Sequence, residues 1–509
     1  MDWLLALLSA LIGALAVLLS PFVASSWVLV ASRSGSEPRS EWNVRNHFGG
    51  ISPWRAKTAG VVTDIDDIPP GCALDQVHMM SRHAERYPTM LPGIRMLELY
   101  HRLQNTNETL PGAVAAASRS NFYAPFPSEQ FEQLTSTGPF AGTLQAFKSG
   151  TIFRTRYQTL LDRALELRQT SFWTSDSPRC IETARYFATG FFGLDWNDTA
   201  SLHVIPENVD QGGSTLTPGR ACPNYIKNRN ERGHEFGNRQ LKAFRSSYLP
   251  KIKDRFAADS PGFSFDEAEI YSMQEYCAFE TLVRGDSKWC DVFTHDEWES
   301  FEYARDLLHY YRAGPGNPFA APGGMLWLKA TAELMLQGTE AGNLFFSLIM
   351  AQTERALELM ATSSNHDGDI FNLLSALQLF QEPEDLPTDR VKHDRTWRLS
   401  DVTPMGARIV LERYVCPSSP PQCWTNELYP NHEHCEEQMY EPYVRLSIND
   451  GIVPIPRCQD GSPGGGCLLS NFLSLVNVRD QETPDWASMC DVDQKLPKRI
   501  DFLHQNHRK

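Results

Sequence analysis

The sequence predicts an α/β core that is interrupted by a helical cap. Strand, loop and helix patterns alternate on both sides of a block, 196–335, in which aromatic and charged residues recur at helical spacing. The chain has 509 residues, of which 41% are hydrophobic, so it can bury a large core and more than one domain. Together these observations favour an α/β domain with a helical insertion.

The expected strands and helices follow from the spacing of apolar residues. Apolar runs, or apolar residues that alternate with polar ones, predict strands at 72–80, 171–174, 356–362, 401–414 and 443–448. Apolar residues at intervals of three and four predict helices at 90–104, 153–170, 178–187 and 369–380. A polar loop that starts at Ser81 separates the first strand from the first helix.

These patterns also divide the chain into segments. The α/β core is expected at 71–195 and 336–495, with the cap at 196–335 between its two parts. A polar linker, 32–70, precedes the core, and a short tail, 496–509, follows it.

The N-terminal segment, 1–31, indicates the cellular compartment. Residues 3–31 contain no charged side chain, and a stretch of this length exceeds a usual signal-peptide core and could span a bilayer. A cleaved signal peptide predicts a secreted protein, whereas a retained signal anchor predicts a type II membrane protein tethered at the cell surface. Both place the rest of the chain outside the cytosol, where the N-x-T sequons at Asn107 and Asn197 are candidate glycosylation sites.

The charge balance argues against one class of partner. The formal net charge is −15, and an acidic surface disfavours nucleic acid, which proteins bind through Lys and Arg. A small phosphorylated substrate is compatible with this charge, because a local cluster of arginines can bind phosphate inside an acidic protein.

The strongest local signal for function is the loop SRHAERYPT at 81–89. It follows an apolar strand, which is where open α/β sheets place their ligand sites. Arg82 and Arg86 flank His83, and guanidinium groups match the geometry of phosphate oxygens. A neutral histidine between them can attack phosphorus. The alternative is a polar surface loop with two solvated arginines.

This loop resembles the Arg-His-Gly-x-Arg-x-Pro signature of the histidine acid phosphatase family, above all its fungal acid phosphatase and phytase members. The likeness runs from about residue 72 to residue 490. Further segments resemble the family in the same order: LTSTG at 134–138, RTRY at 154–157, TSDSPRC at 174–180, YYRAGPGNP at 310–318 and NHD at 365–367. The resemblance implies a mixed, mainly parallel sheet with helices on both faces and a smaller helical cap domain.

The resemblance also implies a mechanism. His83 would be the nucleophile that carries the phosphoryl group, and Asp367 would protonate the leaving alcohol and then help water attack the intermediate. The phosphate ligands would be Arg82, Arg86, Arg179 and His366. The substrate would then be a small phosphomonoester, cleaved at acidic pH without a metal or other cofactor.

Two of these assignments have alternatives. The dipeptide His-Asp also occurs at 295–296 and 393–394, but only the pair at 366–367 follows a strand candidate and precedes an apolar helix. Asp367 could also cap that helix, and this role is compatible with catalysis. Arg179 could be solvated in the first helical turn, although its position just after a strand favours the phosphate pocket.

One departure from the family motif suggests a different function. Ala84 stands where the family has glycine, which in such a loop often marks a positive φ angle. This change could indicate a weakened or inactive phosphate-binding homologue. Retention of the arginines, of both histidines and of Asp367 argues against that interpretation.

The resemblance leaves the substrate open between general phosphomonoesters and inositol hexakisphosphate, the substrate of a phytase. Glu85 and the acidic balance favour general phosphomonoesters, because like charges disfavour binding of a polyanion. A cofactor-dependent mutase would be cytosolic, which disagrees with the N-terminal segment.

The 11 cysteines contain no CxxC pair, which favours long-range disulfides over a zinc finger. His432, His434 and Cys435 are close in sequence, but no second ligand pair completes a metal site there. The family pairing implies Cys72–Cys416, Cys222–Cys490, Cys277–Cys290 and Cys458–Cys467. Cys423–Cys435 is expected as a further bridge peculiar to this chain, which leaves Cys180 as the odd thiol.

Overall fold

The structure is a computed structural model, and it divides the chain into two compact units, Met1–Trp42 and Asn43–Lys509. It describes residues 42–62, 68–119, 130–228, 231–349, 369–418, 423–426, 429–435, 439–458 and 461–505. The predicted leader, 1–31, lies outside these ranges, as does the strand predicted at 356–362. None of the helices within the described ranges combines the length and apolar character needed to cross a membrane.

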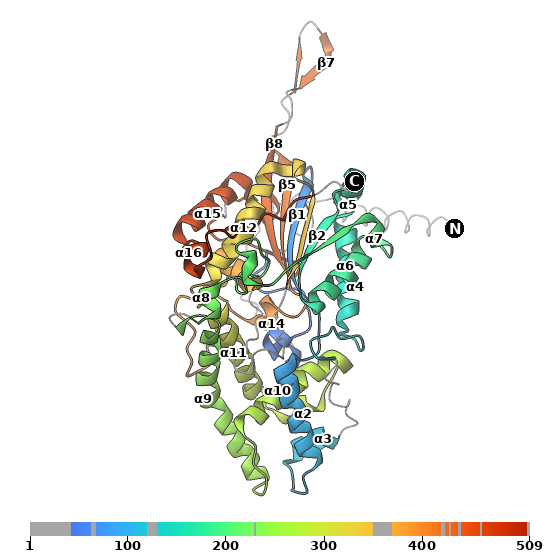
Figure 1. The fold of residues 1–509 in the computed structure, drawn as a ribbon. Coiled ribbons are helices and arrows are strands. Elements are labelled where there is room, and N and C mark those ends of the chain that lie inside the picture. The colour runs from blue at the N-terminus through green and yellow to red at the C-terminus, as the bar shows by residue number, and fades with distance from the viewer. Residues whose placement is uncertain are drawn as a thin grey trace, which may run out of the picture. The chain divides into compact units, whose positions relative to one another are not determined.

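An eight-stranded mixed sheet forms the centre of the second unit within the described residues, in the order β10-β8-β5-β1-β4-β2-β3 with β9 beside β8 (Figure 1). β1, β4, β2 and β3 pair in parallel, whereas β5, β8, β9 and β10 add antiparallel pairs. The predicted mixed α/β fold is confirmed, although its antiparallel half is as large as its parallel half. The strands are β1 (Ala73–Arg82), β2 (Ser171–Ser175), β3 (Ser201–Ile205), β4 (Leu344–Ile349), β5 (Arg408–Pro417), β8 (Tyr440–Ile448), β9 (Gly451–Val453) and β10 (Cys467–Leu468). A separate hairpin pairs β6 (Cys423–Asn426) with β7 (Tyr429–Cys435).

β1 is the central strand that leads into the predicted phosphate loop. It is buried from Gln76 to Arg82 because β4 and β5 flank its edges and helices cover both its faces. Val77 and Met79 pack into the core on one face, and Met80 packs into the core on the other. Alternate residues of β1 therefore face opposite layers, which fixes the register of the loop that follows.

Helices cover both faces of the sheet (Figure 1). One layer contains α4 (Gly142–Arg156), α5 (Gln158–Leu167), α6 (Pro178–Phe191) and α7 (Trp196–Thr199). The other contains α12 (Ala320–Gln337), α13 (Asp369–Ala376), α15 (Leu469–Glu482) and α16 (Trp486–Cys490). α4 and α6 approach closely, since a Cβ atom on Gly150 would lie 2.1 Å from the Phe187 carbonyl oxygen.

A helical lobe lies beyond one end of the sheet (Figure 1). Its members are α2 (Met90–Gln104), α3 (Gly112–Arg119), α8 (Pro223–Ile226), α9 (Glu235–Asp259), α10 (Glu267–Arg284), η6 (Lys288–Val292) and α11 (His295–Arg312). The lobe differs from the predicted range 196–335. β3 falls inside that range but joins the sheet, whereas α2 lies outside it but packs on α10, where Tyr276 donates to the Met96 carbonyl oxygen at 2.9 Å.

The segments next to the core also pack on it. In the range predicted as a linker, 3₁₀ turns η1 (Val44–His47) and η2 (Gly49–Ile51) precede a buried Ser52. The short helix α14 (Leu399–Val402) lies against η2. In the range predicted as a tail, Gln505 accepts a hydrogen bond from the Ser171 amide and donates one to the Ser171 carbonyl oxygen.

Among the described residues, two long-range disulfides, Cys72–Cys416 and Cys222–Cys490, and two local ones, Cys277–Cys290 and Cys458–Cys467, cross-link this unit. They are the pairs that the family resemblance implied. Cys180 is a buried free thiol. Cys423 and Cys435 lie opposite each other in the β6–β7 pairing, but their side chains lie outside the described part of the chain, so this bridge stays a prediction.

Candidate active site

Three parallel strands end together at one edge of the sheet. Arg82, the last residue of β1, is in register with Ile349, the last residue of β4. β2 lies on the other side of β4 and ends at Ser175. The carboxyl ends of neighbouring parallel strands form the usual ligand site of an α/β sheet, and the 81–89 loop starts there.

His83 is fully buried in this loop. Its Nδ1 atom lies 2.7 Å from the carbonyl oxygen of Ala84. Because a carbonyl oxygen can only accept, Nδ1 must carry the proton, and the lone pair of the neutral ring is then on Nε2. The backbone therefore fixes the tautomer in which Nε2 can act as a nucleophile.

Ala84 is accommodated without a left-handed backbone. It is not among the non-glycine residues with positive φ. Its side chain packs in a small apolar cluster with Leu134 and Ala146. The methyl group that replaces the motif glycine thus fills core space, and this position does not have the positive φ that a glycine in such a loop often marks.

Thr183 ties the histidine loop to helix α6. Its hydroxyl accepts a hydrogen bond from the Ala84 amide at 3.1 Å and donates one to the Arg179 carbonyl oxygen at 2.7 Å. The first turn of α6, which carries Arg179, is therefore bonded through one side chain to the residue after His83. No sequence motif pointed to Thr183, because its role depends on a contact between positions 99 residues apart.

Arg82 and Arg86 are buried rather than solvated, with relative exposures of 2% and 7%. Nη1 of Arg82 donates to the carbonyl oxygens of Gly50 and Thr403, at 2.7 and 2.8 Å. Nη1 of Arg86 donates to the Tyr87 carbonyl oxygen, and its guanidinium lies 5.9 Å from the ring centre of Phe279 in α10. These contacts hold both guanidinium groups at fixed places beside the loop.

Arg179 is also completely buried, so the solvated alternative is wrong. Its Nη1 atom lies 3.4 Å from Oε2 of Glu132. Nε and Nη2 are buried and have no hydrogen-bond partner among the residues that the structure describes. A buried guanidinium with two unused donors is a group that an anion can satisfy.

His366 and Asp367 lie outside the described residues. The residues that bracket this segment are described, and both belong to the same region. Ile349 is in register with Arg82, and its carbonyl oxygen accepts a hydrogen bond from the Cys180 thiol at 3.2 Å. Asp369, which begins α13, lines a pocket beside the site.

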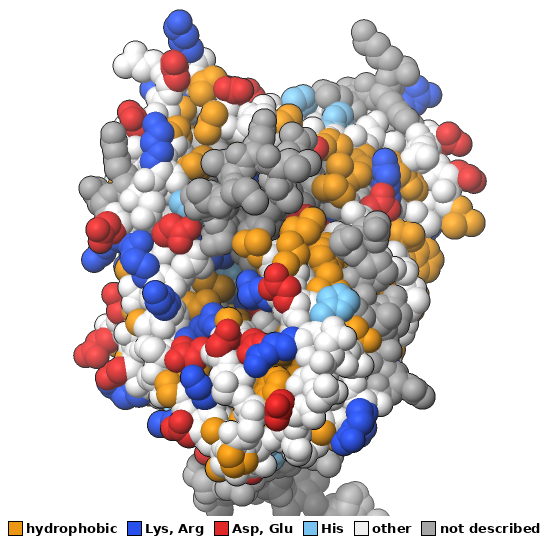
Figure 2. Space-filling view, turned by 60° about the horizontal axis from the view of Figure 1, so that its bottom comes forward, with side chains coloured by type: hydrophobic (Ala, Val, Ile, Leu, Met, Phe, Trp, Pro, Cys, Tyr) orange, Lys and Arg blue, Asp and Glu red, His pale blue; other side chains and the backbone are white. Residues whose placement is uncertain are grey.

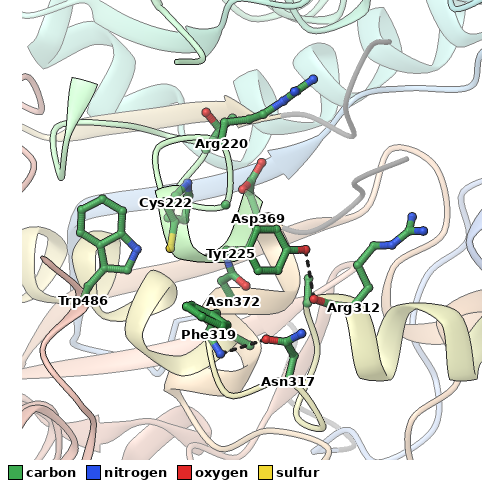
Figure 3. Close-up of a pocket in the computed structure, with 14 residues that line it drawn as sticks. Arg220, Cys222, Tyr225, Arg312, Asn317, Phe319, Asp369, Asn372 and Trp486 are labelled. Carbon is green, nitrogen blue, oxygen red and sulfur yellow. Dashed lines mark hydrogen bonds between the residues drawn. The ribbon is translucent and has the colours of Figure 1, made fainter. Parts of the chain in front are cut away.

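This pocket contains polar residues that the sequence did not single out (Figure 3). It lies where α8 and α11 meet α13 and α16, and its lining includes Arg220, Tyr225, Arg312, Asp369 and Asn372. Tyr225 donates to the Arg312 carbonyl oxygen at 3.1 Å. These residues come from three separate segments, so their proximity had no local sequence signal.

The pocket is linked electrostatically to Arg179. Burial lowers the pKa of Arg220, and nearby Arg179 adds to that lowering, whereas Glu207 and Asp369 oppose it. Burial raises the pKa of Glu207, while Ser175, Arg220 and Arg179 lower it. Arg179, Arg220 and Glu207 thus form one interacting group at the end of β2.

Glu85 differs from its predicted role. Its side chain is completely buried and its Oε1 atom accepts a hydrogen bond from the Trp54 amide at 2.9 Å. Burial raises the pKa of Glu85 to about 7, against smaller lowering effects of backbone hydrogen bonds and Arg82. Glu85 is therefore buried, and its raised pKa favours the neutral form at acidic pH, which weakens the argument that its charge repels a polyanionic substrate.

Over the face shown in Figure 2, acidic and basic side chains are interspersed with apolar ones. The described residues contain no group of three or more His, Cys, Asp and Glu that could hold a metal ion. The side chains of His432, His434 and Cys435 lie outside this search.

Comparisons with known proteins give the family. The model of the histidine phosphatase superfamily (branch 2) matches residues 73–449. A phytase of Candida albicans is 31% identical over 468 residues, which cover 91% of this chain and 90% of the relative. An acid phosphatase of Komagataella pastoris is 30% identical over 465 residues, with the same coverage of both chains.

Solved structures agree with this relationship. The crystal structure of the phytase from D. castellii superposes with a TM-score of 0.76 at 30% identity, covering 93% of each chain. A multiple inositol polyphosphate phosphatase of Bifidobacterium longum shares the fold, with a TM-score of 0.55 at 16% identity over 87% of this chain and 99% of that one. This chain therefore belongs to branch 2 of the histidine phosphatase superfamily and is a hydrolase of the histidine acid phosphatase family.

Proposed function

We propose that this protein is an acid phosphatase that cleaves phosphomonoesters through a phosphohistidine on His83. One observation carries the proposal: the Nδ1 atom of His83 donates to the Ala84 carbonyl oxygen, in a loop bonded through Thr183 to the helix of Arg179. Nε2 is then the atom that attacks phosphorus. The leaving alcohol takes the ester oxygen, and water later releases the phosphate from His83.

The three buried arginines would bind the phosphoryl oxygens. Phosphoryl transfer needs mainly positioning and charge stabilisation, because its transition state spreads negative charge over three oxygens. Arg82 and Arg86 are held by backbone carbonyl oxygens, and Arg179 keeps two donors unused. Fixed donors of this kind cost little reorganisation when the charge develops.

His366 and Asp367 are proposed to complete the site. His366 would donate to the phosphate, and Asp367 would give its proton to the leaving alcohol and then accept one from water. The segment that carries them is bracketed by Ile349, beside Arg82, and by Asp369. A carboxylic acid donor favours activity at low pH, since the reference pKa of Asp is about 3.9.

The substrate is proposed to be a general phosphomonoester, with inositol hexakisphosphate as the second candidate. The buried position of Glu85 removes one reason to disfavour a polyanion, and relatives include both phytases and acid phosphatases. Comparison of kcat/KM for inositol hexakisphosphate and for p-nitrophenyl phosphate on the same preparation distinguishes the two.

The four disulfides support folding in the secretory pathway, since such bridges persist in oxidising compartments. Asn107 and Asn197 are exposed, as glycosylation requires. We therefore propose a secreted or cell-surface protein, with residues 3–31 as its leader or tether.

The function is tested with His83→Ala. We expect the rate of p-nitrophenyl phosphate hydrolysis at pH 4–5 to fall at least about a thousandfold, because the group that forms the covalent intermediate is removed. The matched control is His101→Ala, an exposed histidine on α2, which should retain wild-type kinetics. Comparable rates for His83→Ala and the wild type would contradict the mechanism.

A further inference from the structure

We propose that Glu132 is a positioning residue that turns Arg179 so that its Nε–Nη2 edge faces the phosphate. This inference rests on the proposed function of the same site. A guanidinium group offers more than one pair of parallel donors to an anion. Glu132 Oε2 lies 3.4 Å from Nη1, so the carboxylate occupies one nitrogen. Nε and Nη2, the two donors without partners in the described part of the chain, then form the remaining fork.

The backbone around Glu132 explains how its carboxylate reaches Arg179. The Glu132 amide donates to the Pro88 carbonyl oxygen, and the Tyr87 amide donates to the Gln133 carbonyl oxygen, both at 2.9 Å. Leu134 forms a β-bridge with Arg86. Glu132 itself has φ of 70°, a conformation that non-glycine residues adopt rarely. The segment is therefore bonded to the histidine loop, and the unusual φ sets the direction in which the side chain leaves the backbone.

Burial makes this orientation consequential. The Arg179 side chain has no exposed surface and that of Glu132 is 12% exposed, so water cannot easily replace the contact. A guanidinium that could rotate freely would present only one donor to the phosphate in some orientations, and the affinity of the site for phosphate would be lower. A nearby negative charge also weakens attraction of an anion, but the bond to Nη1 leaves the opposite edge available. We therefore expect orientation to outweigh repulsion.

The test separates orientation from charge. Glu132→Ala removes the acceptor and the charge, whereas Glu132→Gln keeps an amide oxygen that can still accept from Nη1. We expect the KM for p-nitrophenyl phosphate and the calorimetric Kd for inorganic phosphate to rise about tenfold in Glu132→Ala and about twofold in Glu132→Gln. If repulsion dominated, both constants would fall in both variants, and the proposal would be overturned.

A double-mutant cycle locates the effect on Arg179. Lysine has no planar fork, so Glu132→Ala should add little to the defect of Arg179→Lys. If the fold-change in the double variant equalled the product of the two single-variant fold-changes, Glu132 and Arg179 would act independently, and the proposal would be overturned. Glu182→Ala is the matched control, because Glu182 is a carboxylate on α6 that pairs with the exposed Arg185.

The outcome is independent of the covalent mechanism. Phosphate binding measured by calorimetry reports on Glu132 and Arg179 even if His83→Ala retains turnover. Failure of the phosphohistidine proposal would thus appear as retained turnover in His83→Ala. Loss of the positioning role would appear in the phosphate affinities of the Glu132 and Arg179 variants.

Discussion

At the residue scale, Glu85 shows how the site can hold an acid without adding charge. The Trp54 amide donates to Oε1 of its carboxyl group, while Oε2 has no hydrogen-bond partner among the described residues. Burial therefore favours the neutral form, which raises the pKa to about 7 from an ordinary value of 4.5. At acidic pH the group contributes packing and one hydrogen bond beside His83, and little repulsion of phosphate.

This shift predicts how stability depends on pH. Because folding raises the pKa of Glu85, its neutral carboxyl group stabilises the folded state fully below about pH 4.5. This contribution to the free energy of unfolding is lost as the pH rises through about 7. We expect the wild type to lose about 3 kcal/mol of unfolding free energy relative to Glu85→Gln over that window. Urea denaturation of both proteins at several pH values measures the difference. A constant difference would contradict the assignment.

At the scale of elements, the contact between α4 and α6 holds the helix that carries Arg179. Gly150 and Gly190 allow the two backbones to touch, and Cβ atoms there would lie 2.1 and 2.2 Å from carbonyl oxygens of the opposite helix. Backbone atoms cannot move away as a flexible side chain can. The position of α6 against the histidine loop therefore depends on these two glycines.

Gly150→Ala should force the helices apart. We expect a loss of about 2–3 kcal/mol in unfolding free energy, at the upper end for overpacking, and a raised KM because Arg179 moves with α6. Gly112→Ala in α3 is the control, since a Cβ atom there meets nothing within 4 Å. The free energy of unfolding of Gly112→Ala should stay the same or rise slightly, because alanine favours helix more than glycine does. Equal melting temperatures for both variants would contradict this packing argument.

At the scale of the whole molecule, Cys72–Cys416 closes the longest loop among the described disulfides. It joins residues 344 positions apart, at the start of β1 and the end of β5. Cys277–Cys290 spans only 13 positions within the helical lobe. In the chain-entropy model, a bridge that closes a longer loop restricts the unfolded chain more.

Removal of these two bridges should therefore lower the free energy of unfolding by different amounts. On this model we expect Cys72→Ser with Cys416→Ser to lower the unfolding free energy by about 6 kcal/mol, and Cys277→Ser with Cys290→Ser by about 3 kcal/mol. Guanidinium denaturation of the two double variants under oxidising conditions compares them. A larger loss for the short bridge would show that native-state contacts, not loop closure, decide the order.

The sequence predicted the features that depend on local pattern. The apolar run before Ser81 and the pattern at 178–187 correctly indicated the strand and helix that place His83 and Arg179. Glu132, Thr183 and Arg220 carried no such signal, because their roles arise from contacts between distant segments. The burial of Glu85 carried no signal for the same reason: its charge was expected to act on a polyanionic substrate, but its side chain is buried beside Trp54, a residue distant in sequence.

The order of pairing around β1 also bears on how the protein is made. The two strands that pair with β1 are far C-terminal to it: β4 starts at Leu344 and β5 at Arg408. A ribosome adding roughly 5–20 residues per second needs about 20–70 s to pass from Cys72 to Cys416. Until β4 has been made, β1 has neither of its strand partners, so its apolar residues are open to aggregation in the nascent chain.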